Sequence, residues 1–444
     1  MISRKIVYVI MFVLMFSLVG FNLYSGGKES TKEEGITINI WALAGEQDAL
    51  WRKVGELYHR DHPDVNFNIT VQSDEFIDTN LITTYAMKPD NVDFATFWTG
   101  TRIATMVKND SALNLDPWFE KYDWDEKLLP GYRANIIPGF GNACFSSDWM
   151  SHSLIFYNKK VFSKLGVKPP KTIDEFYTLC DKIKAAGIQP IAMGGKDAWP
   201  LHMVYNQMIA RYMSAKKVEE FNNWAYDPNR SAKAAEIYRS EPAIKAWEFM
   251  AELNERGYYG EGVNSLDFLD ATEIFQSGKA AMTFGFSWTP VTIKQAVPEF
   301  EIDYFLMPEY QGNTAIPTEY MNVIVFPISL AEEKKSILAD MLNELITNEE
   351  YIIEALLKQG KFPTSKTISD PKKIAEYSGE PLYAKMLNDL KKWGGVTITD
   401  DWLAMPLIKE YYNLCMSVTE GTVSPKEAGQ SMYEVALEIL EEEK

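Results

Sequence analysis

The sequence predicts an α/β protein made of two or three packed units. Its 444 residues are 46% hydrophobic, so the chain can bury a large core, and cores of this size usually divide into more than one unit. Residues 36–41 and 65–71 alternate between apolar and polar as strands do, and a segment of helical period lies between them. That order is typical of a βαβ unit, the building block of α/β folds.

The first unit begins with this βαβ pattern, which we expect to be parallel and right-handed. Between the two strands, one helical face carries Leu50, Trp51, Val54, Leu57 and Tyr58. A second helix at 76–87 leads to an apolar run at 92–98. Trp41 and Trp98 therefore follow strand patterns, at the end of an open α/β sheet where ligands usually bind.

The middle of the chain leads from the first unit to a second one. Residues 113–145 are rich in aromatic residues and prolines without clear periodicity, which favours loops and short helices against the first unit. Residues 153–157 then carry the chain across. In the helix that follows, Thr172 and Glu175 have the spacing of a capping box, and Gly187 is placed to end the helix.

The remaining elements follow the same alternation before the chain becomes mainly helical. At 275–284 a helix end, a glycine stop and a strand predict a segment that crosses back to the first unit. The last helix, 424–443, begins with a second capping box at Ser424. Further helices are expected near 201–213, 234–238 and 243–255, and further strands at 302–307 and 320–327.

Charge and the N-terminus limit the function and place the protein outside the cytoplasm. A formal charge of -18 repels nucleic acid and anionic membrane surfaces, so we expect neither as a partner. Residues 1–26 combine two basic residues with a long apolar run, which predicts a signal peptide or an uncleaved N-terminal anchor. Residues 27–35 are then a tether, and the protein is exported, to the periplasm or the cell surface.

The sequence shows no motif for catalysis, metal binding or a cofactor. The three cysteines are too few for a disulfide framework, and Cys180 lies on an apolar helical stripe, as a small core residue would. His59 and His62 have metal-like spacing, but they close a helix and no third ligand is evident. We therefore expect no metal and no cofactor.

Several segments together resemble a known family. They are Tyr157-Asn158-Lys159, Gly187 before Pro190, 275–282 with Trp288 beyond, and 421–428. They resemble the extracellular solute-binding proteins of ABC transporters, in the maltose- and oligosaccharide-binding branch, over nearly the whole exported part. The resemblance implies a monomer with two α/β lobes, a hinge, a ligand cleft between the lobes, and delivery of the ligand to a membrane permease.

The expected lobes follow from where the chain crosses between them. We assign 36–152 and 286–330 to lobe 1, and 153–285 and 331–444 to lobe 2, which is the more helical. In the family, an acidic residue often precedes the crossing strand. Here Ser151 and His152 occupy that place, and Asp148 is the nearest carboxylate.

The resemblance and the chemistry of sugars point to one set of ligand-binding residues. A sugar offers flat C–H faces and a rim of hydroxyls, so its binder needs aromatic rings and polar partners. By resemblance, aromatic and polar contacts come from both lobes, and charged side chains near the tryptophans are candidates for hydroxyl recognition. Core packing or a solvated surface is the alternative role for each of them. The candidates are Trp41, Glu46, Trp98, Arg102, Asp148, Asp197, Trp199, Trp288, Glu319 and Trp402.

The expected function is non-enzymatic capture of a mono- or oligosaccharide for an ABC importer. One alternative is a binding protein for another solute, such as a peptide, a polyamine or an organic acid. A second, from another class, is a carbohydrate-active enzyme that uses paired carboxylates. A ligand screen separates the first two, and turnover of a bound oligosaccharide identifies the third.

Overall fold

The computed structural model describes residues 35–43, 46–87, 91–129, 136–137, 139–146, 148, 151–227, 229–319 and 323–442. The expected export segment 1–26 and nearly all of the tether 27–35 lie outside these residues. Among the helices that the structure describes, none is long and apolar enough to cross a bilayer.

A five-stranded sheet with the order β2-β1-β3-β13-β6 forms the core of the first lobe. β1 pairs in parallel with both β2 and β3, whereas β13 runs antiparallel to β3 and to β6. The expected parallel strand pair is therefore confirmed. The strands are β1 (Ile36–Leu43), β2 (Val65–Gln72), β3 (Phe94–Phe97), β6 (Phe145–Ser146) and β13 (Val323–Val325).

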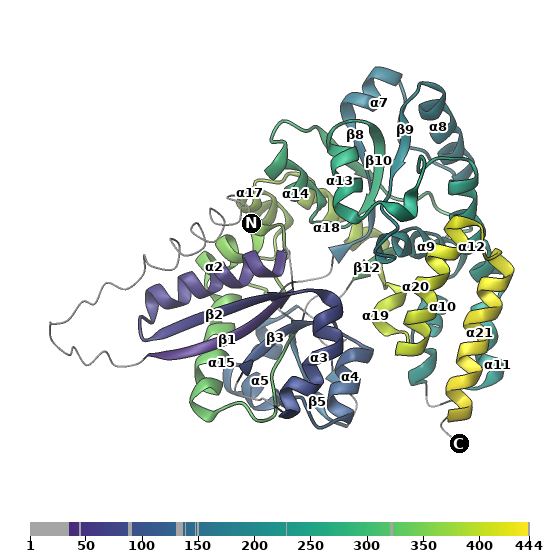
Figure 1. Ribbon diagram of the computed structural model, residues 1–444. Helices are drawn as coiled ribbons and strands as arrows, with labels where there is room; N and C mark the ends of the chain where they lie inside the picture. Colours follow the sequence, from purple (N-terminus) through teal and green to yellow (C-terminus); the bar gives the residue numbers. More distant parts are fainter. Residues whose placement is uncertain are drawn as a thin grey trace, which may run out of the picture. The chain divides into compact units, whose positions relative to one another are not determined.

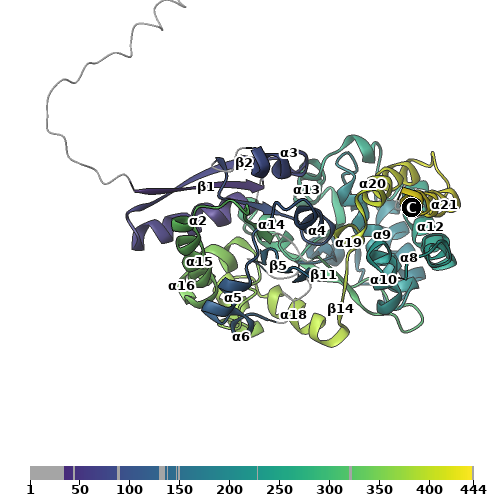
Figure 2. The same ribbon diagram turned by 90° about the horizontal axis from the view of Figure 1, so that it is seen from below.

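Helices pack on both faces of this sheet because β1 alternates between two apolar clusters. Ile38 and Ile40 share one cluster with Trp51 of α2 (Glu46–Asp61). Leu43 faces the other way and shares a cluster with Leu81 of α3 (Asp74–Met87). Figure 2 shows α2 and α15 (Glu332–Thr347) on the side of β1 and β2 opposite α3. The predicted helical face of α2 is buried throughout, which confirms that interpretation.

A four-stranded sheet with the order β11-β8-β10-β9 forms the core of the second lobe. β10 pairs in parallel with β9 and antiparallel with β8, and β11 adds antiparallel to the far edge of β8. The alternation of strand and helix that the sequence predicts is thus present here too. The strands are β8 (Leu154–Asn158), β9 (Gln189–Ala192), β10 (Ala280–Gly285) and β11 (Ile302–Phe305).

A bundle of four helices enlarges the core of the second lobe. α9 and α12 pack against each other and against α20, and α21 lies against α12 and α20 (Figure 1). Trp247 of α12 is fully buried, with its ring centroid 4.1 Å from that of Tyr205, so it is a core residue. The helices are α9 (Trp199–Tyr212), α12 (Glu241–Glu255), α20 (Met405–Glu420) and α21 (Pro425–Glu442).

The capping signals mark real helix ends. The hydroxyl of Ser424 accepts from the backbone N–H of Glu427, and the Glu427 carboxylate accepts from that of Ser424, so α21 begins with a reciprocal capping box. At α8 (Ile173–Ala185) Thr172 accepts from Glu175 N–H, but the Glu175 carboxylate accepts from Lys171 N–H rather than from Thr172 N–H. Only half of that predicted box is present.

A small sheet with the order β14-β12-β7 collects the segments that pass between the two larger sheets. Along the chain, β7 (Ser151–His152) follows β6 of the first sheet and precedes β8 of the second. β12 (Ile316–Glu319) follows β11 of the second sheet and precedes β13 of the first. β14 (Gly395–Thr397) pairs in parallel with β12.

The observed packing differs in three places from the expected course of the chain. The segment 275–284 is expected to cross back to the first unit, but its strand β10 pairs with β8 and β9 inside the second sheet. β11, in the range 286–330 that was assigned to lobe 1, pairs with β8 of the second sheet. α15, assigned to lobe 2, packs on α2, where the Tyr58 hydroxyl donates to Asp340 at 3.1 Å. β11 and α15 each cover an apolar face formed by residues that are distant in the sequence. The local pattern of apolar residues does not reveal such contacts.

The other described elements are short and connect these layers. The remaining helices are α4 (Thr101–Lys108), α5 (Asp116–Tyr122), α6 (Trp124–Lys127), α7 (Lys159–Leu165), α10 (Ala215–Asn222), α11 (Ala232–Ala235), α13 (Phe268–Gln276), α14 (Thr289–Ala296), α16 (Glu349–Tyr351), α17 (Pro371–Ser378), α18 (Leu382–Trp393) and α19 (Thr399–Trp402). Short helical turns are η3 (Trp224–Tyr226), η4 (Glu236–Arg239), η5 (Val263–Ser265), η6 (Ile352–Leu356) and η7 (Leu357–Gln359), and the short hairpin strands are β4 (Ile136–Ile137) and β5 (Gly141–Asn142).

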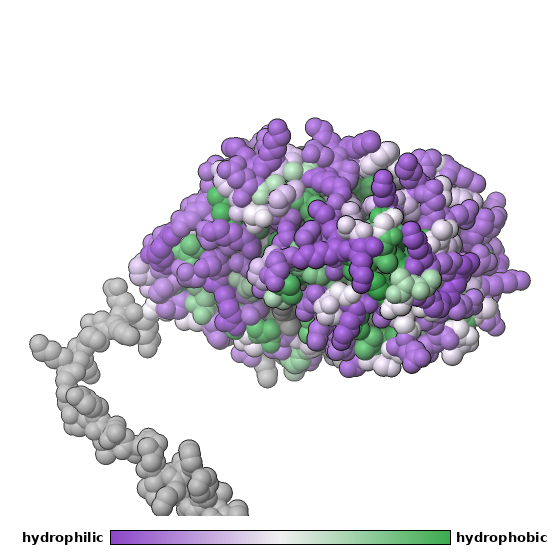
Figure 3. Space-filling view, turned by 90° about the horizontal axis from the view of Figure 1, so that it is seen from above, coloured by the Kyte–Doolittle hydropathy of each residue, from purple (hydrophilic) through white to green (hydrophobic). Residues whose placement is uncertain are grey.

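Figure 3 shows that hydrophilic side chains dominate the face it presents, with smaller apolar patches between them.

Candidate functional site

Three aromatic rings meet where the helices α9, α13 and α14 begin. Trp199 is the first residue of α9, Phe268 the first of α13, and Trp288 caps the start of α14. The ring centroids of Trp199 and Phe268 are 4.9 Å apart, and those of Phe268 and Trp288 are 5.5 Å apart. All three side chains are half-buried, so part of each ring stays accessible. We call Trp199, Phe268 and Trp288 the aromatic triad.

Backbone contacts hold the helix starts of the triad together. The Asp197 carboxylate accepts from the backbone N–H of Phe268 at 3.2 Å, which ties the start of α13 to the loop before α9. A Cβ on Gly194 would lie 2.1 Å from the carbonyl oxygen of Asp267, so only glycine permits this approach. Asp197, a predicted hydroxyl ligand, therefore positions Phe268.

The predicted pair from the first lobe, Trp98 and Arg102, is also assembled. The guanidinium carbon of Arg102 lies 4.8 Å from the centre of the Trp98 ring, and its Nε is 2.9 Å from the Asp78 carboxylate. The Arg102 side chain is only 10% exposed. Burial alone would lower the Arg102 pKa, but Asp78, with help from Tyr412 and Asp400, raises it above its usual value.

The start of α4 lies directly against the segment that carries Trp402. The Thr101 hydroxyl donates to the carbonyl oxygen of Leu403 at 2.7 Å, and Tyr226 donates to the Thr101 hydroxyl. Gly100 comes so close that a Cβ there would lie 1.9 Å from the carbonyl oxygen of Asp401. The structure thus brings the start of α4, which follows Trp98 and carries Arg102, next to the backbone of Trp402.

A buried polar cluster connects this junction with the aromatic triad. His202 Nδ1 lies 2.9 Å from one Asp400 oxygen, and the Tyr412 hydroxyl donates to the other at 2.6 Å. Burial would raise the Asp400 pKa, but His202, Tyr412 and Arg102 together lower it below its usual value. The His202 ring also meets Trp199 edge to face at 6.4 Å. Trp98, Arg102, Trp402, Trp199 and Trp288 therefore belong to one contiguous region.

A family model described as bacterial extracellular solute-binding protein matches residues 43–335. The chain belongs to this family. The family and the α/β two-lobe fold that the sequence predicts are thereby confirmed.

Individual relatives agree with this assignment. A multiple sugar-binding protein of Streptococcus mutans is 28% identical over 296 residues, which are 63% of this chain and 63% of that protein. An uncharacterised ABC transporter extracellular-binding protein of Pyrococcus horikoshii is 23% identical over 326 residues, 69% of each chain. The structure of a chitin oligosaccharide binding protein superimposes with a TM-score of 0.78 at 19% identity, covering 91% of this chain and 99% of that one, which shows the shared fold.

Four other candidate residues of this solute-binding protein are placed differently. Trp41, on β1, meets Phe76 edge to face at 5.3 Å. Asp148 is buried in an ion pair with Lys361 at 3.0 Å, which gives its carboxylate a partner within the protein. The side chains of Glu46 and Glu319 lie outside the described residues. Ligand contact by any of the ten candidates stays a prediction.

Sequence reasoning missed three residues that deserve to join the candidates. Phe268 completes the triad, and its only sequence signal is the capping box of Asp267 and Asp270 just before α13. Gln47 is 2% exposed, and among the described residues neither atom of its amide has a partner. His152, 1% exposed on the crossing strand β7, likewise has no described partner at either ring nitrogen. Buried polar groups without partners are costly, so both positions suit contact with a ligand or water.

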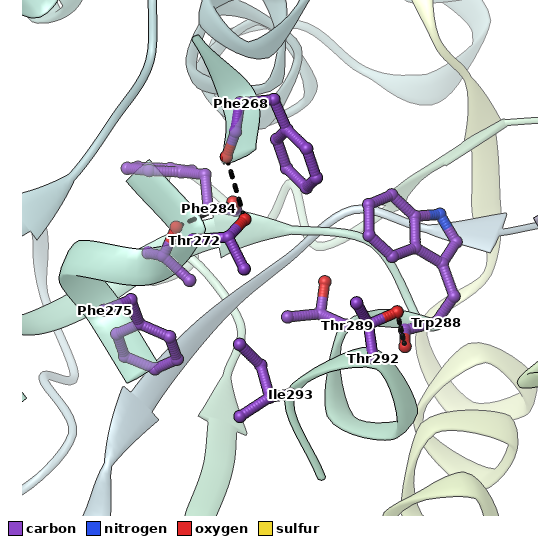
Figure 4. A pocket seen from close by; sticks show the side chains of 9 residues that line it. Phe268, Thr272, Phe275, Phe284, Trp288, Thr289, Thr292 and Ile293 are labelled. Carbon is purple, nitrogen blue, oxygen red and sulfur yellow. Dashed lines mark hydrogen bonds between the residues drawn. The ribbon is translucent and has the colours of Figure 1, made fainter. Parts of the chain in front are cut away.

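One hollow adjoins the aromatic triad, and another lies apart from it. A small cavity of about 10 Å³ lies beside Trp288 and is shown in Figure 4. A wider groove of about 780 Å³ lies between α10 and α12, away from the triad, and is lined among others by Lys217 and Glu220. These two side chains form an ion pair with each other, so the groove offers fewer open polar contacts than its composition suggests.

Among the described residues, no three histidine, cysteine or acidic side chains are grouped so that they could hold a metal ion. His59 Nδ1 lies 2.6 Å from the carbonyl oxygen of Val65, and the His62 ring stacks on Tyr58. The three cysteines are buried free thiols, and Cys180 lies in the core of the second lobe, which confirms its predicted role.

Proposed function

We propose that this protein binds a carbohydrate between its two lobes and delivers it to the permease of an ABC importer. The aromatic triad carries the proposal. Trp199, Phe268 and Trp288 gather partly accessible rings in one place, and such rings are what the C–H faces of a sugar pack against. The similarity to a multiple sugar-binding protein supports the same ligand class.

Contacts across the lobes support a mechanism in which the ligand drives closure. A ligand shifts an open-closed equilibrium only if it binds one state better than the other, which requires contacts that form on closing. Trp98 and Arg102 on one side, and Trp199 and Trp288 on the other, are linked through Asp400 and His202. A sugar held between them would touch both lobes. The three crossing strands β7, β12 and β14 are then the place where the hinge bends.

The remaining parts of the proposal follow from the family. The protein acts as a binding protein without turnover of its ligand, works as a monomer, and is exported. Residues 1–26 serve as a cleaved signal or as an anchor that keeps the protein near its permease. The proposed ligand-contacting set comprises the candidates from the sequence other than Asp148, which is paired with Lys361, and adds Gln47, His152 and Phe268.

A thermal-shift screen of the full-length protein tests this function. The panel contains neutral mono- and oligosaccharides, peptides, polyamines and organic acids, each far above the affinity expected for a transport ligand. A ligand at about 100 times its dissociation constant adds about 3 kcal/mol to the free energy of unfolding, which raises the melting temperature measurably. Shifts with peptides or amines but with no sugar would overturn the proposal. Turnover of a sugar that binds would replace it with the enzymatic alternative.

A further inference from the structure

A small cavity is present beside Trp288. It lies between helix α13, the end of strand β10 and the first turns of helix α14, and Phe268 and Trp288 of the aromatic triad form part of its wall (Figure 4). Its volume of about 10 Å³ admits one group the size of a water or a methyl, and no sugar ring. The lining residues are Phe268, Thr272, Phe275, Thr283, Phe284, Trp288, Thr289, Thr292 and Ile293.

Four threonines line the cavity, and three of their hydroxyls already donate to backbone carbonyls. Thr272 donates to Phe268 at 2.8 Å, Thr283 to Ala192 at 3.1 Å, and Thr292 to Trp288 at 3.4 Å. These three hydroxyls are therefore satisfied within the protein.

Thr289 differs from the other three. It is 6% exposed, and its hydroxyl has no hydrogen-bond partner among the described residues. Figure 4 shows this hydroxyl pointing into the space between the rings of Phe268 and Trp288. Gly285 packs closely against this hydroxyl, since a Cβ on Gly285 would lie 2.5 Å from the Thr289 oxygen. A buried hydroxyl without a partner is a costly feature unless a ligand or a water completes it.

The lining selects the chemistry of the occupant. None of its nine residues carries a charge, so a carboxylate, sulfate or phosphate would be desolvated without compensation. The walls are aromatic and aliphatic, with one free hydroxyl. A sugar hydroxymethyl group would bury a hydroxyl that can both donate and accept a hydrogen bond. Only the Thr289 hydroxyl is available as a partner, so part of this capacity would stay unsatisfied. A carbonyl oxygen needs a single donor, and a methyl next to it suits the apolar wall.

We infer that the sugar bound against Trp288 carries an acetyl group at this point, whose methyl enters the cavity and whose carbonyl oxygen accepts a hydrogen bond from Thr289. This inference rests on the proposed carbohydrate-binding function and narrows it to acetylated neutral sugars. The acetyl can belong to an acetamido group or to an acetate ester, because both present the same methyl and carbonyl.

Matched sugar pairs test the inference on the full-length protein by calorimetry. N,N′-diacetylchitobiose is compared with cellobiose, which has hydroxyls in place of the acetamido groups, and O-acetylated xylobiose is compared with xylobiose. One buried hydrogen bond and one buried methyl predict about tenfold tighter binding, or more, of the acetylated member in at least one pair. The pair that responds identifies the amide or the ester as the source.

Two threonine variants make the test specific. Thr289→Val keeps the shape and removes the free hydroxyl, so the preference for the acetylated sugar should fall to about twofold or less. Thr347→Val is the control, because its hydroxyl already donates to the Asn343 carbonyl of α15 at 2.7 Å and lies outside the cavity. Melting curves confirm that both variants fold.

The outcomes separate this inference from the proposed function. Equal affinity within both pairs, or an unchanged preference in Thr289→Val, would mean that the cavity holds an ordered water only, and would overturn the inference. If other carbohydrates of the screen bind while no acetylated sugar is preferred, the proposed function stands without it. If no carbohydrate binds at all, both are overturned.

Discussion

The hydroxyl of Thr101, at the start of α4, donates to the backbone carbonyl of Leu403 at 2.7 Å, although the two residues are 302 positions apart. This bond joins the helix that carries Arg102 to the segment that carries Trp402. Gly100, directly before it, has a φ of +71° and sits against the carbonyl of Asp401. The region of the candidate site where the two lobes meet therefore depends on close backbone contact.

Replacing Gly100 should disrupt this contact. In Gly100→Ala the new Cβ would lie 1.9 Å from a backbone oxygen, and backbone cannot move aside as a flexible side chain can. The control is Gly379→Ala, which has the same φ of +71° but no atom within 4 Å of its Cβ. Gly379→Ala carries the strain of a left-handed helical residue, about 1 kcal/mol, whereas Gly100 combines its φ with a ψ of -129°, outside that region. Gly100→Ala should therefore lose roughly 2 kcal/mol more in the free energy of unfolding, from backbone strain and from this contact together. Urea titration measures both, and equal losses would contradict the packing described at Gly100.

Trp288 should contribute more to ligand affinity than to stability. It is half-buried at the end of the aromatic triad, so Trp288→Ala should weaken binding of the preferred sugar by about 2 kcal/mol. Calorimetry with the sugar found in the screen measures this loss. Trp393→Ala is the matched control, since Trp393 is also half-buried but ends α18 and packs with the core around Leu390. An equal affinity loss in both variants would argue against the triad as the binding surface.

Local sequence patterns predicted the parts of the fold whose partners lie nearby in the chain. The stripe from Leu50 to Tyr58, the parallel pairing of β1 with β2 and the capping box at Ser424 all depend on residues within one supersecondary unit. The place of α15 on α2 could not be read in this way. It depends on apolar faces that meet only after the chain has crossed to the second lobe and back.

At the candidate site, too, the sequence indicated the residues with local signals and missed those whose neighbours come from distant elements. The tryptophans at 98, 199 and 288 follow strand or glycine signals, and the structure places each beside other candidates. Phe268 and His202 carry no comparable signal, because their importance comes from neighbours contributed by other elements. Asp148 resembled a free carboxylate near the crossing strand, yet its partner Lys361 lies 213 positions away.

His152 should make stability depend on pH. Complete burial lowers its pKa from about 6.5 to about 4, so the folded protein favours the neutral ring. Above pH 6.5 both states are neutral and nothing is lost. As the pH falls from 6.5 to 4, the unfolded chain takes up a proton that the folded protein does not, and stability falls by roughly 3 kcal/mol in all. Below pH 4 the contribution is constant.

His152→Gln removes this contribution while keeping a neutral polar side chain. Between pH 7.5 and 4, the wild type should therefore lose roughly 3 kcal/mol more of its unfolding free energy in urea titrations than the variant does. Carboxylates titrate in both proteins, so their contribution to the pH dependence of stability cancels in the difference between the two. A constant difference between the two curves across this range would show that His152 is hydrated enough to be protonated in the folded protein.

The ion pair of Asp148 and Lys361 should be structural, which separates it from the ligand-contacting candidates. The two side chains are 5% and 4% exposed, so removing one partner leaves a buried charge. Lys361→Met should cost about 3 kcal/mol of unfolding free energy, and the double variant with Asp148→Leu should recover a large part of it. A double-mutant cycle by urea titration measures the coupling. Sugar affinity of the folded double variant should stay near the wild-type value. A large loss of affinity with little coupling in stability would return Asp148 to the set of residues that recognise the ligand.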